Sequence, residues 1–166
     1  MVRILDREME IKRLNIVDIA EKRFQEALKE LDIAEVFLKD GLLRNAAGKA
    51  FQAWKSLLSY LALKNLELLE SRYRGFKRVG SRSIPLYEWI AAVIPTNRMA
   101  EVAAIIEERI HGIAELTALA LQLHEYQYNG PDPEGIRSKI PNEDTARELT
   151  RILLTRTKEI IRSLEV

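Results

Sequence analysis

The chain has 166 residues, of which 47% are apolar and 31% are charged, and its 26 basic residues nearly balance its 25 acidic ones. This length and apolar content predict one folded domain with its own core, and they exclude a disordered or low-complexity chain. The absence of cysteine excludes disulfides, thiolate nucleophiles and cysteine-ligated metal sites. Because there is no apolar run of about 18 residues and no signal-peptide pattern, we expect a cytoplasmic protein without a membrane partner.

The near-neutral total conceals an uneven distribution of charge. Residues 41–87 carry nine basic and two acidic residues, whereas residues 88–134 carry two basic and eight acidic ones. Such asymmetry is typical of interaction surfaces. The two segments can attract each other within one chain or across a two-fold axis, and the second arrangement leads us to expect a homodimer.

The first half of the chain predicts a helical hairpin. Apolar residues at helical spacing predict a first helix over Ile16–Lys39, capped by Asn15, and a second from Leu42 to about Ser71. The short break at Asp40-Gly41 predicts that these helices fold back on each other as an antiparallel pair. The second helix is apolar on more than one side, which also favours dimerisation.

The rest of the chain is expected to be helical apart from its connections. Residues Arg72–Ile84 lack a sustained period and contain two glycines, so we expect a loop there. Three more helices are predicted, at Leu86–Ile94, Arg98 to about Tyr126 and Glu143–Leu164, with a turn of helix before Pro141. The fold class is therefore all-α: an antiparallel up-and-down bundle of four to five main helices with short connecting helices. It is expected to be one domain over residues 16–166, behind an N-terminal extension of residues 1–15.

The segment from Arg72 to Arg82 is the best candidate for a binding site. It holds five cations, and no acidic residue occurs between Ser71 and Tyr87. Basic side chains neutralise phosphates and aromatic rings stack on bases. The segment therefore predicts nucleic-acid or anion binding through Arg72, Arg74, Lys77, Arg78 and Arg82, with Tyr73 and Phe76 as stacking residues. The alternative is a solvated loop, or one tethered to an acidic surface of its own fold or of a partner.

The second predicted helix adds three cations to this candidate site, Arg44, Lys49 and Lys55. Arg44 and Lys55 are three helical turns apart and share a face, while Lys49 lies on another flank. These side chains are candidates for the wall of a pocket that binds an anion. Alternatively, their stems cover the edge of the core while their charged ends reach water.

Patterns for catalysis or metal binding are sparse. The chain has no glycine-rich phosphate loop and no nucleophile-elbow motif. Glu108 and His111 form an E-x-x-H pair, but a carboxylate-bridged di-metal site needs a second one, and Leu121 stands where a glutamate would be needed before His124. A solvated strip of Glu and His explains the pattern as well, so we expect neither a metal nor a cofactor.

Two stretches carry a family resemblance. The stretch from Phe37 to Lys55, in which Gly41 ends one helix and Ala46-Ala47-Gly48-Lys49-Ala50-Phe51 opens the next, resembles the helical hairpin of the archaeal PaREP family. The stretch Leu123-His124-Glu125-Tyr126-Gln127-Tyr128-Asn129-Gly130 is similar to a Leu-His…Tyr stretch of the same family. That family looks like a branch of the HEPN-type helical bundles. The resemblance implies a four- or five-helix up-and-down bundle, frequent dimerisation and association with nucleotides or RNA.

The same resemblance argues against ribonuclease activity. HEPN-type ribonucleases place an arginine four to six residues before a histidine, so that the imidazole can act in RNA cleavage. No arginine precedes His111 or His124 at that spacing, and no histidine follows Arg44 at that spacing. We therefore expect a protein that is not an enzyme.

Three hypotheses for the function remain. In the first, the chain is a non-catalytic, dimeric module that binds nucleotide or RNA through Arg44, Lys49, Lys55 and the 72–82 segment. In the second, it is a protein-interaction module whose basic surface meets an acidic partner. In the third, it is a divergent ribonuclease that uses His111 with Arg109 and Glu108.

Overall fold

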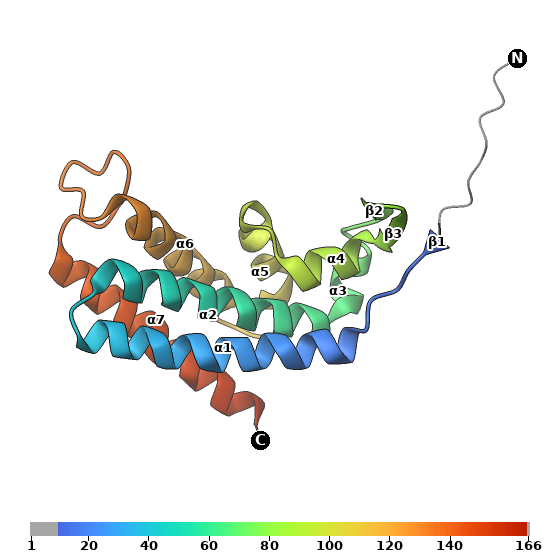
Figure 1. Ribbon diagram of the computed structural model, residues 1–166, viewed down its shortest axis with the longest axis horizontal. Helices are drawn as coiled ribbons and strands as arrows, with labels where there is room; N and C mark the ends of the chain where they lie inside the picture. Colours follow the sequence, from blue (N-terminus) through green and yellow to red (C-terminus); the bar gives the residue numbers. More distant parts are fainter. Residues whose placement is uncertain (1–9, 166) are drawn as a thin grey trace, which may run out of the picture.

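The computed structural model describes residues 10–165, which form seven α-helices and three short strands (Figure 1). The long helices α1 (Ile16–Lys39), α2 (Leu43–Lys64), α6 (Ile113–Asn129) and α7 (Glu143–Leu164) make a bundle. The shorter α3 (Leu66–Glu70), α4 (Leu86–Val93) and α5 (Met99–Glu107) gather around the C-terminal half of α2. The predicted all-α bundle is therefore confirmed.

The predicted antiparallel hairpin of α1 and α2 is also confirmed, and local signals account for it. The Asn15 Oδ1 atom accepts a hydrogen bond from the backbone N–H of Asp18 at 3.2 Å and so caps α1. At the other end, Gly41 has a φ of 75°, a left-handed conformation that suits glycine and reverses the chain within a few residues.

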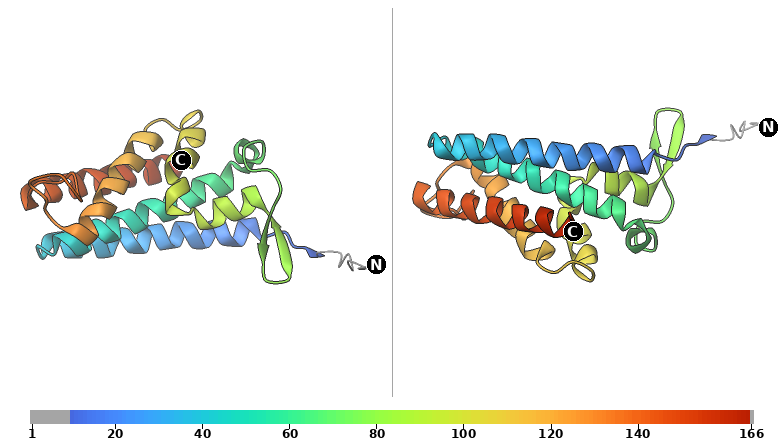
Figure 2. Two further views of the ribbon diagram at one scale, coloured as in Figure 1. Left: turned by 90° about the horizontal axis from the view of Figure 1, so that it is seen from above. Right: turned by 90° about the horizontal axis from the view of Figure 1, so that it is seen from below.

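Helix α2 is the centre of the core. It packs against α1, α4, α6 and α7, so most of its residues are buried and it is apolar on nearly every side (Figure 2). Much of that surface is alanine, which allows neighbouring helices to approach closely. Trp54 is fully buried, and its Nε1–H donates to the hydroxyl of Thr117 on α6 at 2.9 Å. The apolar sides of α2 that favoured a dimer in the sequence are thus covered within one chain.

Two predicted helices are broken in the structure. The second predicted helix ends at Lys64 because Asn65 leaves helical geometry and its side-chain amide donates to the Leu61 carbonyl at 2.7 Å. The third predicted long helix is divided into α5 and α6. Between these two, Gly112 adopts a φ of 90°, and the Glu107 carboxylate accepts from the N–H groups of Gly112 and Ala114, each at 2.8 Å.

The predicted loop at Arg72–Ile84 is wrong, because most of it forms a β-hairpin. Strands β2 (Phe76–Val79) and β3 (Arg82–Pro85) pair antiparallel around a turn at Gly80, whose φ is 61°. Strand β1 (Glu10–Ile11) adds to β3 in parallel, so the strand order is β1-β3-β2. All four residues of β2 are exposed, so the apolar alternation that identifies a half-buried strand is missing from its sequence.

The last predicted helix, α7, has the predicted bounds, with Asn142 Oδ1 accepting from the Thr145 N–H at 2.8 Å. The predicted turn of helix before Pro141 is not formed; the Asp132 carboxylate instead organises this connection by accepting from the N–H groups of Gly135, Arg137 and Ser138. Within residues 10–165 no single helix is long and apolar enough to cross a membrane. The segments Leu86–Val93 and Thr96–Glu107 are long and apolar enough only when taken together, and they are bent by 109° relative to each other.

Candidate functional sites

The basic segment of the sequence runs from the turn after α3, which holds Arg72 and Arg74, into the β2–β3 hairpin, which holds Lys77, Arg78 and Arg82. The hairpin stands off one end of the bundle beside β1 (Figure 2). All five cations of the segment are exposed. None of the five forms an ion pair with a carboxylate among the residues that the structure describes. Lys77 lies with its Nζ atom 4.8 Å from the ring centre of Trp89, and Arg78 donates from Nε to the Gly80 carbonyl at 3.3 Å. The acidic α5 and α6 therefore do not neutralise the hairpin by direct pairing.

The two aromatic residues predicted to stack have different environments. Phe76 is 57% exposed on β2, whereas Tyr73 is 5% exposed and belongs to the hydrophobic core. Burial raises the pKa of the Tyr73 hydroxyl, and the neighbouring Glu101 adds to this effect. The sequence places Tyr73 among arginines, but its ring is needed for packing. Phe76 is consequently the ring of this segment that a ligand can reach.

A pocket of about 510 Å³ lies at the base of the hairpin. Its lining includes the cations Arg13 and Arg74, the rings of Phe76 and Tyr87, and the carboxylates of Glu67 and Glu70. The Arg13 guanidinium donates to the Tyr87 hydroxyl and to the Glu88 carboxylate, both at 3.2 Å, and Glu88 also accepts from the Leu14 N–H at 3.1 Å. Because Glu88 is buried, these contacts fix the segment before α1 against the first turn of α4, which forms part of the pocket wall.

The three cations of α2 do not converge on one cleft. Arg44 donates to the backbone carbonyls of Gln127 and Tyr128 at the end of α6, where helix carbonyls lack helical partners. Lys49 forms an ion pair with Glu30 of α1 at 2.9 Å. Both cations thus have partners inside the bundle, which corresponds to the structural alternative considered for them.

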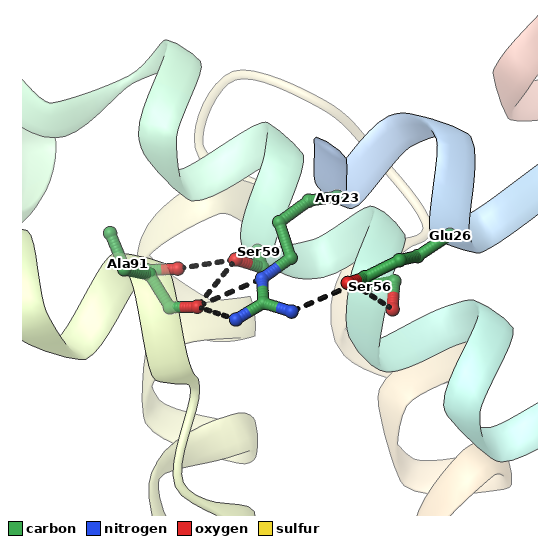
Figure 3. A network of polar contacts seen from close by, with 6 residues as sticks. Arg23, Glu26, Ser56, Ser59 and Ala91 are labelled. Carbon is green, nitrogen blue, oxygen red and sulfur yellow. Dashed lines mark hydrogen bonds and ion pairs between the residues drawn. The ribbon is translucent and has the colours of Figure 1, made fainter. Parts of the chain in front are cut away.

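Lys55 differs from the other two cations of α2. It is half-buried and lines a second pocket of about 390 Å³ between α1, α2 and the end of α4. Within residues 10–165 it makes neither an ion pair nor a hydrogen bond. Burial and the nearby Arg23 lower the pKa of its ammonium group. Arg23 itself is held in place by Ala92 and Glu26 (Figure 3).

Comparison with known proteins assigns the chain to a family. The family model described as "Archaeal PaREP1/PaREP8 family" matches residues 22–150, which is more than half of the chain. The chain belongs to the archaeal PaREP1/PaREP8 family. No curated protein and no solved structure matched it. The PaREP1/PaREP8 match begins inside α1 and ends inside α7, so it contains the β2–β3 hairpin and all of α2. It also contains Arg74, which lines the first pocket, and Lys55, which lines the second.

The His124 stretch that carried part of the PaREP resemblance forms an aromatic cluster between α2 and α6. The His124 ring stacks on Phe51, with centres 4.1 Å apart, and meets Tyr128 edge-on at 5.2 Å. Burial lowers the pKa of His124 and favours its neutral form, an effect to which Lys55 also contributes. This cluster joins residues more than 70 positions apart, so no local pattern in the sequence signals it.

The remaining histidine lies in the connection between α5 and α6. The His111 side chain is 93% exposed, and its Nδ1 atom lies 4.0 Å from Glu107, whose carboxylate already binds backbone N–H groups. Glu108 is exposed as well. Arg109 turns away to Asn65 and Glu67. The trio of Arg109, Glu108 and His111 considered for a divergent ribonuclease is therefore not brought together on a common pocket.

Proposed function

We propose that the protein is a non-catalytic module that binds single-stranded RNA through the β2–β3 hairpin and the turn before it, and that it forms a homodimer when no RNA is bound. The observation that carries the proposal is the exposed positive charge of the 72–82 segment, whose cations form no ion pair within residues 10–165. Five cations and an exposed Phe76 lie within eleven consecutive residues, Arg72–Arg82, while the chain as a whole is nearly neutral. The positive charge is therefore concentrated in this segment and is not a property of the whole surface.

The hairpin suits a phosphate backbone better than a small ligand. Its cations are spread over the projecting ribbon and the turn before it, so several can meet successive phosphates of one strand and release condensed counterions. Phe76 offers a flat apolar face on which an unpaired base can stack, and base stacking contributes about 1–3 kcal/mol in single-strand binders. RNA rather than nucleotide is proposed because the cations do not converge on one point.

The α2 cations have a secondary place in this proposal. Arg44 and Lys49 are bound to Gln127, Tyr128 and Glu30, so recruiting them to RNA requires breaking existing contacts. The HEPN-type resemblance supports an association with RNA, but the arginine-to-histidine spacing of its ribonucleases is missing from this chain. Binding without cleavage is the function that fits both facts.

The proposal is tested by measuring the affinity for a single-stranded RNA over a range of salt concentrations. We expect affinity to fall steeply with salt. Replacing Arg74, Arg78 and Arg82 by alanine should reduce the slope of log affinity against log salt by about two, since each neutralised phosphate of a single strand contributes about 0.7. The matched control replaces Lys29, Arg137 and Arg162, three exposed cations elsewhere, and should leave the slope unchanged.

The same experiment separates RNA from an acidic protein partner. Phe76→Leu keeps an apolar side chain but removes the flat ring, so it should weaken RNA binding while leaving the salt slope intact. Absence of RNA binding at low salt, or equal losses in the hairpin variant and its control, would reject the proposal. RNA cleavage that is lost in His111→Ala would favour the divergent ribonuclease instead.

A further inference from the structure

The pocket of about 390 Å³ beside Lys55 is separate from the hairpin. It lies between α1, α2 and the end of α4, and side chains from α1 and α2 form most of its wall: Arg23, Glu26, Glu30, Gln52, Lys55 and Ser56. Its volume falls within the range of small-molecule sites. The wall is polar, which sets it apart from a packing defect of an apolar core.

Hydrogen bonds hold one side of this pocket in a fixed arrangement (Figure 3). The Arg23 guanidinium donates from Nε and Nη2 to the Ala92 carbonyl, at 3.0 and 2.8 Å, and from Nη1 to Glu26 at 2.7 Å. The buried Ser59 hydroxyl donates to the Ala91 carbonyl at 2.6 Å. Arg23 on α1 and Ser59 on α2 both donate to carbonyls at the end of α4, so the fold sets the position of the guanidinium.

The charges around the pocket leave one cation uncompensated. Glu26 accepts from Arg23, and Glu30 pairs with Lys49 at 2.9 Å, so each carboxylate already has a cation of its own. Lys55 remains, half-buried and next to the guanidinium of Arg23, with no ion pair or hydrogen bond in the described part of the chain. Its lowered pKa is the expected consequence of burial beside a like charge. A half-buried ammonium without a counter-ion is an unfavourable arrangement that a bound anion would relieve.

We propose that this pocket binds a small ligand through an oxyanion group, a phosphate or a carboxylate, that pairs with the ammonium group of Lys55. The Gln52 amide, on the same wall, can donate a further hydrogen bond to the oxygens. The Ser56 hydroxyl donates to Glu26 at 3.5 Å and can reach the ligand only by leaving this long contact. With Lys49, which pairs with Glu30 from outside the lining, three cations and two carboxylates surround the pocket, and this single excess positive charge suits one compact oxyanion rather than a chain of phosphates. The site is distinct from the RNA surface proposed for the hairpin, and either can exist without the other.

The test is an anion titration of the 166-residue chain in which NMR monitors the backbone amide resonances. Inorganic phosphate and acetate are added in separate experiments, with ionic strength held constant by sodium chloride. We expect saturable shifts at Lys55, Ser56 and Val93, produced by at least one of the two anions. Lys55→Met, which keeps the length of the side chain and removes its charge, should weaken binding by about tenfold or more. Lys55→Arg should retain binding.

Controls distinguish this site from general attraction to positive charge. Lys64→Met removes an exposed lysine from the end of the same helix and should not change the affinity. Saturation by phosphate alone assigns a phosphate ligand, and saturation by acetate alone assigns a carboxylate. The proposal is overturned by non-saturable shifts for both anions, by equal binding in Lys55→Met and the unmodified protein, or by shifts confined to the β2–β3 hairpin. Thermal unfolding of each variant shows whether it remains folded.

Discussion

At the scale of single residues, buried hydrogen bonds determine which helices pack against each other in the core. Trp54 could be assigned to the core from its helical spacing, but its partner Thr117 lies 63 positions away on another helix. An indole N–H left without an acceptor inside the core costs more than the hydrogen bond contributes when it is formed. Contacts of this kind favour one packing of α2 against α6.

Thr117→Val tests this contact, because valine keeps the shape of threonine and removes the acceptor. We expect the free energy of unfolding to fall by about 1–3 kcal/mol, the cost of an unsatisfied buried donor. Chemical denaturation with tryptophan fluorescence measures it. Thr155→Val, at an exposed position of α7, should change stability little. A similar loss in both variants would show that the hydrogen bond is not the cause.

His124 gives the protein a pH-dependent stability. Its pKa is lowered from the ordinary value of 6.5 by burial, so below that value the unfolded chain binds a proton more readily than the folded chain does. Stability should therefore fall as the pH drops from about 6.5 towards the lower pKa of the folded state. Denaturation curves over this range measure the effect.

Two variants separate His124 from other titrating groups. His124→Gln should remove this part of the pH dependence, since the side chain no longer takes up a proton. His111→Gln, at a position that is 93% exposed, should keep the profile of the unmodified protein. Equal profiles for the unmodified protein and His124→Gln would contradict the assignment.

At the scale of elements, caps and helix breaks determine the path of the chain. The bounds of α1 and α7 could be predicted from the sequence because Asn15 and Asn142 cap them through contacts three residues away. The division between α5 and α6 is set by Glu107, which caps α6 from the end of the preceding helix. Its carboxylate also faces the positive end of the α6 dipole, and the backbone hydrogen bonds lower its pKa.

Glu107→Ala tests whether this carboxylate maintains the break. We expect a loss of about 1 kcal/mol in the free energy of unfolding, typical of removing a helix cap. Glu108→Ala, the adjacent exposed carboxylate without these contacts, provides the matched control and should have a smaller effect. Amide hydrogen exchange in the first turn of α6 should rise in the Glu107 variant alone. Unchanged exchange there would show that Gly112 suffices to define the break.

The β2–β3 hairpin shows why some elements could not be predicted. Each of the four residues of β2 is exposed, so hydrophobic patterning provides no signal for a strand. Two of the four, Lys77 and Arg78, are cations of the kind that is typical of a loop. The hairpin is supported by β1, which pairs with β3 across more than 70 positions. The cations of this segment could be predicted as a candidate site from the sequence, but not that Lys77, Arg78 and Arg82 project from the bundle on a β-ribbon.

At the scale of the whole molecule, the oligomeric state remains a prediction. The uneven distribution of charge favours a dimer in which the basic segment of one copy meets the acidic segment of another. Within one chain, the hairpin cations form no ion pairs with the described acidic residues, so this attraction is still free to act between molecules. A dimer held in this way uses the same cations as the proposed RNA site, so we expect RNA and dimerisation to compete.

Sedimentation equilibrium at several salt concentrations measures this state. At low salt we expect the mass of two 19.1-kDa chains, and dissociation as salt screens the attraction between exposed charges. The Arg74, Arg78 and Arg82 triple variant should weaken the dimer, and the Lys29, Arg137 and Arg162 variant should not. A monomer at every protein and salt concentration would rule out the dimer.

The amino-acid sequence by itself determined the helical class, the α1–α2 hairpin and the ends of α1 and α7. These features depend on periodicity and capping, which act within a few residues. Only the tertiary structure decided that Tyr73 is buried, that Lys49 is paired with Glu30, and that Lys55 has no counter-ion among residues 10–165. Each of these outcomes depends on which side chains from other elements come within a few ångströms. An overall charge near zero therefore describes the composition of the chain, whereas the fold determines which of its charges remain available for binding.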